Sequence, residues 1–104
     1  MKTTLTLAIL ALMAAPLLAD ATPDGASIFK AKCAMCHGPD GSGQTPMGKS
    51  LKIRDLRAAD VQKQSDAELI NIVTNGKNKM LPYKGKLSAE EIKAVVGHLR
   101  SLKK

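Results

Sequence analysis

The chain has 104 residues, of which 16 are Lys or Arg and 9 are Asp or Glu, so its formal net charge is +7. This length allows one small domain. Phe29 and Tyr83 are its only aromatic side chains, and without an aromatic or arginine-rich binding face we do not expect nucleic acid as a partner. So small a core rarely stabilises a fold without a metal, a disulfide or a cofactor. We therefore expect a bulky apolar group from outside the sequence to complete the core.

The N-terminal segment has the features of an export signal. After an early lysine, residues 5–18 are almost wholly apolar, and small residues follow at Ala19 and Ala21. The apolar stretch is too short to span a bilayer, for which a helix needs roughly 20 residues. We therefore predict a signal peptide at residues 1–21, cleaved after Ala19 or Ala21, and a single domain at residues 22–104. The predicted location is the periplasm, with no integral membrane segment in the mature chain.

Three helices are predicted after this segment. The first begins near Asp24, a favourable N-cap, and continues into Cys33. The second and third begin at Ser65 and Ser88, because each serine is followed by acidic residues in the pattern of a capping box. The dipeptide Asn75-Gly76 ends the second helix. In the third helix, apolar residues recur at helical spacing, namely Ile92, Val95, Val96, Leu99 and Leu102.

Two irregular segments connect these helices. Residues 38–57 are rich in Gly, Pro and Ser and are predicted to be a long loop, followed by a short helical turn at residues 58–62. Residues 77–87, which include Met80 and Pro82, form the second loop. Long loops in so small a domain usually have a function or wrap a ligand. Because no segment alternates apolar and polar residues as a strand would, the predicted fold class is all-α.

The run C-A-M-C-H at residues 33–37 carries the chemistry of the chain. In a C-x-x-C-H pattern the two thiols can add to the two vinyl groups of haem, and the histidine can bind the iron. A thioredoxin-like C-x-x-C would need strands around the motif, and none is predicted. A zinc site would need further ligands, for which only His98 is left. We therefore predict one covalent haem c, attached through Cys33 and Cys36, with His37 as an axial ligand.

From Asp24 to its C-terminus the chain resembles the class I cytochrome c family, especially the short bacterial monohaem members. Gly25 and Phe29 stand where the family packs its first helix against its last. His98 stands where that last helix usually has an aromatic residue. The run C-H-G-P-D-G-S-G at residues 36–43 resembles the family's C-H-G-x-D-G-x-G. The resemblance implies a cytochrome c fold, in which a few helices and long loops wrap one haem whose edge reaches the surface.

The position opposite His37 on the iron has several candidate ligands, namely Met80, Met47, His98 and nearby lysines. Met80 lies in the run K-M-L-P-Y at residues 79–83, which resembles the methionine–proline–aromatic ligand loop of the family. The resemblance therefore implies axial ligation by His37 and Met80. Met47 is then expected to be a packing residue, and His98 to replace the aromatic residue at the helix crossing.

Further residues are expected around the ligands. The resemblance implies that the carbonyl of Pro46 accepts a hydrogen bond from the second ring nitrogen of His37. The candidates for contact with the haem propionates are Tyr83, Lys49, Lys52 and Arg54. The pocket wall is expected to contain Leu51, Ile53, Leu56, Leu69, Val73 and Leu87.

With both axial positions filled, the iron has no site for a substrate, so we expect an electron carrier rather than an enzyme. A diffusible monomer would exchange single electrons with redox proteins through the exposed haem edge. Because lysines flank the attachment motif and the Met80 loop, these partners are expected to have acidic docking surfaces. Two alternatives stay open. One is a cytochrome subunit held permanently in a dehydrogenase or oxidase, and the other is a ligand-binding or peroxidatic haem protein in which Met80 is absent or labile as a ligand.

Overall fold

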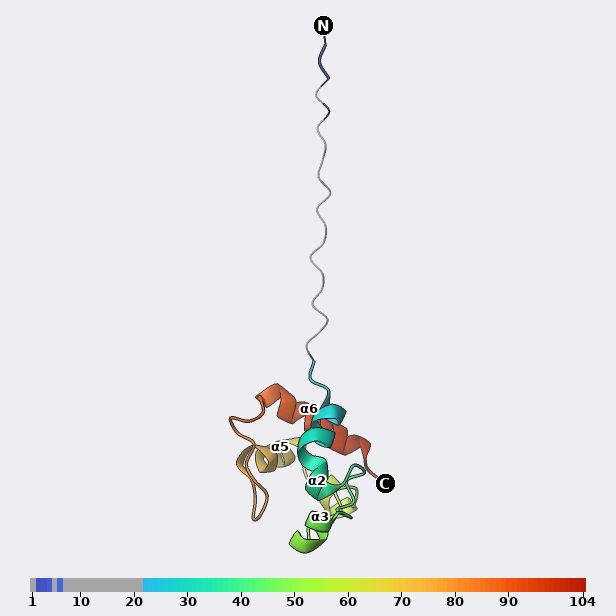
Figure 1. The fold of residues 1–104 in the computed structure, drawn as a ribbon, viewed down its shortest axis with the longest axis vertical. Coiled ribbons are helices and arrows are strands. Elements are labelled where there is room, and N and C mark those ends of the chain that lie inside the picture. The colour runs from blue at the N-terminus through green and yellow to red at the C-terminus, as the bar shows by residue number, and fades with distance from the viewer. Residues whose placement is uncertain (1, 5, 7–21) are drawn as a thin grey trace.

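The computed structural model describes residues 2–4, 6 and 22–104, and most of the predicted signal peptide lies outside the described residues. Figure 1 shows the described helices gathered into one body, with the first helical segment beside the C-terminal helix. The described part contains helices and two isolated β-bridges but no strand, which confirms the all-α class. Within that part, no helix has the length and apolar character needed to cross a membrane.

The first helical segment has three consecutive parts: α1 (Gly25–Ile28), the π-helical turn η1 (Phe29–Cys33) and α2 (Ala34–His37). Asp24 caps its start as predicted, because the Asp24 carboxylate accepts hydrogen bonds from the amides of Ala26 and Ser27. The segment ends at Gly38, whose φ of 82° is unfavourable for other residues. The predicted helix from Asp24 into the attachment motif is therefore confirmed, with a π-helical turn that the sequence pattern did not indicate.

The stretch 38–57, predicted to be a loop, contains a short helix, α3 (Pro46–Leu51). Its N-cap is Thr45, whose hydroxyl oxygen accepts a 2.8 Å hydrogen bond from the amide of Gly48. A proline suits the first turn because no intrahelical partner exists there for an amide hydrogen. The prediction of an uninterrupted loop was wrong, since six residues with few apolar positions are too short to show a helical period.

Three further helices follow: α4 (Ala59–Gln62), α5 (Asp66–Asn75) and α6 (Ala89–Ser101). They confirm the predicted short turn and the two longer helices. Ser88 and Glu91 form the complete capping box expected at α6. At α5 the amide of Glu68 donates to the Ser65 hydroxyl, but the Glu68 carboxylate accepts from that same hydroxyl. Only half of the capping box therefore forms there.

The first and last helices cross tightly. A Cβ atom at Gly25 would overlap the backbone carbonyl of Ala94, so only glycine allows this approach. One turn later Phe29 packs against His98, with ring centroids 5.1 Å apart and ring planes inclined by 53°. His98 therefore occupies the aromatic position at the helix crossing, as predicted, and the crossing holds η1 against α6.

The remaining core joins α4, α5 and α6, and its buried members are Val61, Leu69, Val73, Leu87, Ile92, Val96 and Leu99. Arg100 fixes α6 to the connection between α4 and α5. Its guanidinium donates to the carbonyls of Gln62 and Gln64, and it contacts the Asp66 carboxylate at 2.9 Å. These bonds keep the α4–α5 connection in place as one wall of the cavity described next.

Candidate functional site

A largely apolar cavity of about 360 Å³ lies between the first helical segment and the helices α4 to α6. Five of the six predicted wall residues line it: Leu51, Ile53, Leu56, Leu69 and Val73. Leu87 does not, because it is buried in the adjoining core. The prediction also missed Phe29 and Ile72, which line the cavity from η1 and α5.

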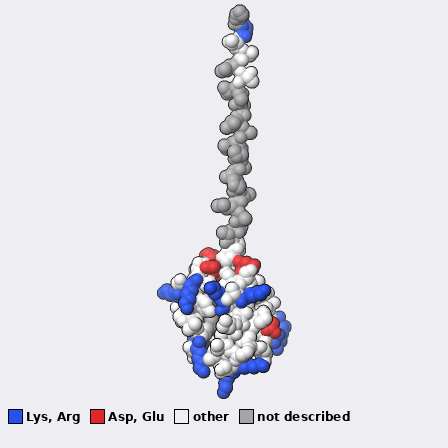
Figure 2. All heavy atoms as spheres, viewed as in Figure 1, with Lys and Arg blue, Asp and Glu red and all other residues white. Residues whose placement is uncertain are grey.

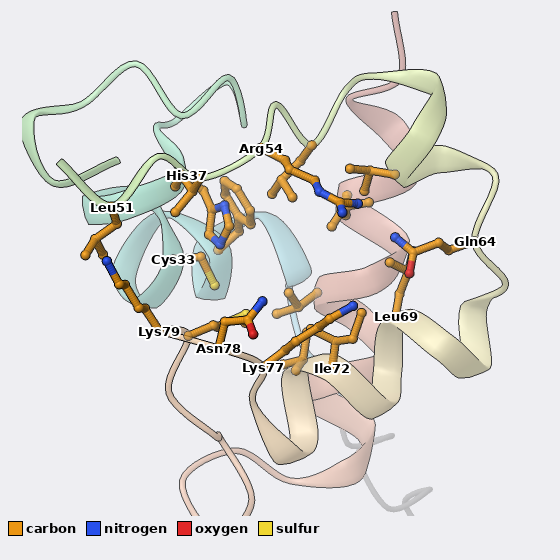
Figure 3. A pocket seen from close by; sticks show the side chains of 18 of the residues that line it. Cys33, His37, Leu51, Arg54, Gln64, Leu69, Ile72, Lys77, Asn78 and Lys79 are labelled. Atoms are coloured by element: carbon orange, nitrogen blue, oxygen red, sulfur yellow. The ribbon is translucent and has the colours of Figure 1, made fainter. Parts of the chain in front are cut away.

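The C-x-x-C-H motif reaches this cavity from one side. Cys33 and His37 both line it, and Figure 3 shows their side chains on the cavity wall formed by the first helical segment. Cys36 is partly buried, and the two cysteines do not form a disulfide with each other. Burial raises the pKa of the Cys33 thiol to about 11, and the neighbouring Cys36 adds to the shift.

The ring of His37 contains a buried nitrogen without a hydrogen-bond partner. This atom is Nδ1. Burial also lowers the pKa of the imidazole, which favours the neutral ring that can bind a metal. The expected bond from this nitrogen to the carbonyl of Pro46 is not made, and Pro46 instead forms the first turn of α3. A buried imidazole nitrogen without a partner is costly, and this is the nitrogen that the resemblance assigned to the orienting bond, so binding of the iron would fall to the other nitrogen of the ring.

Backbone contacts hold the motif against α3 and the loop before it. The Thr45 hydroxyl donates a 2.7 Å hydrogen bond to the carbonyl of Cys36 while it caps α3. A Cβ atom at Gly48 would lie 2.5 Å from that same carbonyl oxygen, so glycine is required for this packing. The amide of Gly43 donates to the carbonyl of His37 at 2.7 Å. These contacts therefore fix the backbone at Cys36 and His37.

Met80 lines the same cavity as His37 and packs against the core. It closes a tight turn, because its amide donates to the carbonyl of Lys77 at 2.9 Å and its carbonyl accepts from the Lys77 amide at 3.2 Å. Asn78 takes the left-handed φ of 54° within this turn, a conformation that asparagine tolerates better than most residues. Met47, by contrast, is 45% exposed on α3 and does not line the cavity, so the expectation that it packs in the core was wrong.

Polar side chains line another part of the cavity. Of the four candidates for propionate contact, Lys52 and Arg54 line it, whereas Lys49 and Tyr83 do not. Gln64 lines the cavity as well, and Figure 3 shows it on the same side as Arg54. Gln64 was not predicted from the sequence, because a single amide in the connection between two helices belongs to no motif. Lys77, Asn78 and Lys79 line the cavity from the Met80 side, so hydrogen-bond donors lie at two parts of a mainly apolar wall.

The donor set fits a c-type haem better than a bare metal ion. In the part of the chain that the structure describes, no group of three or more His, Cys, Asp or Glu side chains could hold an ion. The cavity instead has the Cys33 thiol, the neutral ring of His37 and the thioether of Met80 around an apolar space, with Cys36 one helical turn further on. Thiols that attach the ring and His and Met side chains that bind the iron are the groups used by c-type cytochromes.

The chain is similar along most of its length to known c-type cytochromes. Residues 20–99 match the family model described as "Cytochrome C oxidase, cbb3-type, subunit III". The chain belongs to this family of monohaem class I c-type cytochromes. It is 39% identical over 84 residues to cytochrome c6 of Nostoc sp. strain PCC 7120, a match that covers 81% of this chain and 73% of that protein.

Two further similarities concern an oxidase subunit and a solved structure. The chain is 33% identical over 90 residues to the cbb3-type cytochrome c oxidase subunit FixP of Azorhizobium caulinodans, covering 86% of this chain and 30% of FixP. The solved structure of the KustC0563 c-type cytochrome is 38% identical and superposes with a TM-score of 0.72, covering 78% of this chain and 99% of that one. The cytochrome c fold is thereby confirmed. The family and the C-x-x-C pair show a single covalent haem c and an electron carrier rather than an enzyme.

Proposed function

We propose that the protein is a periplasmic electron carrier whose haem is attached through Cys33 and Cys36 and is ligated by His37 and Met80. When bound, the haem supplies a one-electron iron couple. The observation that carries the proposal is that Met80, which is distant in the sequence from the attachment motif, lines the same apolar cavity as Cys33 and His37.

Each of these side chains has a distinct task in the proposal. The thiols of Cys33 and Cys36 form thioether bonds to the ring and hold it on the first helical segment. His37, whose backbone is fixed by the bonds around it, offers a neutral nitrogen. Met80 offers a soft, neutral sulfur that favours reduced iron and raises the potential. If His37 and Met80 both bind the iron, they would leave no site on it for a substrate, and the bound haem would supply outer-sphere electron transfer.

The polar part of the cavity is proposed to hold the propionates, through Lys52, Arg54 and Gln64. The Arg54 side chain is 65% exposed, and its ion pair with Asp60 spans 3.8 Å. An exposed pair of this kind is weak, so the guanidinium can turn toward a carboxylate of the cofactor at little cost. Two donors of Arg54 can bind one carboxylate together.

The proposed docking surface lies where the attachment motif and the Met80 loop meet solvent. Met35, between the two cysteines, is 78% exposed, and Leu81, directly after Met80, is 62% exposed. Lys32 and Lys79 are exposed beside them. Figure 2 shows acidic side chains gathered at the top of the body and a smaller acidic patch at its right edge, whereas basic side chains predominate over the rest of that face. This separation of charge would orient the carrier toward a redox protein that has an apolar centre surrounded by carboxylates.

The proposal is tested on the protein purified from its host. Its intact mass should equal the chain from Asp20 or Thr22 plus one haem, with no free thiol. Its ferric spectrum should contain the thioether-to-iron charge-transfer band. Two reactive thiols, or a Cys33–Cys36 disulfide without haem, would refute the attachment, and a spectrum without the band would favour the ligand-binding alternative.

The family description supports a second candidate, a cytochrome subunit held permanently in an oxidase. Purification separates the two functions. A diffusible monomeric carrier elutes at the size of one chain, and its complexes dissociate as salt screens the lysines. A complex that survives high salt would favour the subunit.

A further inference from the structure

Tyr83 connects the Met80 loop, which we define as residues 77–87, to the first helical segment. Its hydroxyl donates a 3.0 Å hydrogen bond to the carbonyl of Lys32, 51 residues earlier in the chain. Lys32 directly precedes Cys33, so the accepting carbonyl belongs to the peptide bond that leads into the attachment motif. The Tyr83 ring is partly buried and packs against the core. The bond therefore reaches from the proposed ligand loop to the backbone that carries the proposed attachment site.

Two parts of the Met80 loop are held against the end of α5. First, a Cβ atom at Gly76 would lie 2.6 Å from the carbonyl oxygen of Met80, so the chain is closely packed there. Second, the amides of Tyr83 and Lys84 donate to the carbonyls of Val73 and Thr74, each at 3.0 Å. These contacts position the loop on α5, which is joined to the first helical segment only indirectly, through the shared core and the crossing with α6.

Among the hydrogen bonds of residues 22–104, the one from Tyr83 to Lys32 joins the Met80 loop to the first helical segment. A haem attached through Cys33 moves with that segment, whereas Met80 moves with the loop. The separation between the iron and the Met80 sulfur therefore depends on how these two parts of the backbone are held together.

We propose that the Tyr83 hydroxyl is a positioning group that keeps Met80 on the iron by tying its loop to the peptide beside Cys33. The inference rests on the proposed ligation by Met80. A phenylalanine would fill the same space but could not make the bond, so the hydroxyl contributes to ligand retention rather than to packing. It keeps the sixth position closed to small molecules, which is what separates an electron carrier from a ligand-binding haem protein.

The test compares the holoprotein with its Tyr83→Phe variant and a control, Gln62→Leu. Gln62 donates from its side-chain amide to the carbonyls of Leu56 and Leu99, so the control also loses side-chain bonds between elements, away from the Met80 loop. Imidazole is titrated into each ferric protein at constant neutral pH, and loss of the thioether band is followed. Denaturant unfolding is measured in parallel.

Tyr83→Phe should retain its haem and its thioether band but bind imidazole about fivefold more tightly, the effect of one ordinary hydrogen bond. Gln62→Leu should unfold at lower denaturant but bind imidazole as the wild type does. Equal imidazole affinity in Tyr83→Phe and wild type would overturn the inference, as would an equal gain in both variants.

The wild-type spectrum separates this inference from the proposed function. If the wild type lacks the thioether band, ligation by Met80 fails and the role of Tyr83 fails with it. If the band is present and Tyr83→Phe changes nothing, only the role of Tyr83 fails. Should Tyr83→Phe not mature, proton NMR of the wild type decides, because a bonded hydroxyl exchanges its proton slowly. A rapidly exchanging Tyr83 hydroxyl would refute the inference.

Discussion

The two sides of the cavity are built in different ways. Around the attachment motif, Thr45 and Gly43 bond to the motif backbone, and Gly48 packs against the carbonyl of Cys36. Across the cavity, the Met80 loop is held against the end of α5 in two parts and by the Tyr83 hydroxyl, with Leu81 exposed. The attachment side is therefore rigidly supported, whereas the loop depends on a few contacts. Such an arrangement suits a cofactor that is bonded on one side and ligated reversibly on the other.

The largest effect is expected on removing the attachment itself. The double variant Cys33→Ala, Cys36→Ala should contain no covalent haem, and its chain should be largely unfolded, because the aliphatic core is too small without the cofactor. Circular dichroism should show little helix. A cooperative thermal transition in this variant would show that the attachment side folds without the haem.

The next largest effect concerns the ligand on the loop side. Met80→Ala should keep its covalent haem, lose the thioether band and bind added cyanide. Its reduction potential should fall, because a neutral sulfur ligand favours ferrous iron. The matched control is Met47→Ala, which should change neither the spectrum nor the potential, since Met47 does not line the cavity. The opposite result in the two variants would place the ligand on α3.

The support of the attachment side is tested by adding one methyl group. Gly48→Ala should lower the free energy of unfolding by about 1–3 kcal/mol, because the new Cβ atom is forced against the Cys36 carbonyl. Gly97→Ala in α6 is the control, since nothing lies within 4 Å of a Cβ atom there. It should raise stability by about 0.5–1 kcal/mol through helix propensity. Denaturant midpoints give both values, and equal effects would argue against close packing at Gly48.

The smallest expected effect is on the stability of the fold at acidic pH, through the carboxylate of Asp55. The Arg57 guanidinium donates hydrogen bonds of 2.9 and 3.0 Å to the Asp55 carboxylate, and this pair, joined by Lys104 at 3.4 Å, holds the pKa of Asp55 well below its usual range. Because the folded-state pKa is depressed, the stabilisation is complete above the pKa of an unfolded aspartate, about 3.9. It is lost as the pH falls through the folded-state value.

Asp55→Asn should therefore weaken the pH dependence of unfolding below about pH 4. Unfolding midpoints at neutral and acidic pH measure this. Among the described residues the ion pairs lie outside residues 77–87. Acid should thus destabilise the segment around Asp55 first, while the thioether band, which reports the bond from Met80 to the iron, persists. Loss of the band before any loss of helix would contradict this order.

Local chemistry explains why much of the fold was predictable. An N-cap such as Asp24 or Ser88 accepts hydrogen bonds from amides two or three residues away, so the helix starts predicted from the sequence are the ones that the structure contains. The C-x-x-C-H motif is equally local, because one helical turn carries both thiols and the histidine. The crossing of Phe29 and His98 was predictable only through resemblance to a family, since its residues are far apart in the chain.

The amino-acid sequence by itself therefore determined the helix caps, the attachment motif and the choice of cofactor, because these depend on neighbours within one or two turns. Only the tertiary structure decided that Met80 shares a cavity with His37 while Met47 does not. The tertiary structure also decided that Gln64 faces that cavity. Tyr83 does not line the cavity, and its hydroxyl bonds to the Lys32 carbonyl. The physical reason is that these contacts form between segments separated by long loops, whose relative positions depend on how the whole core packs.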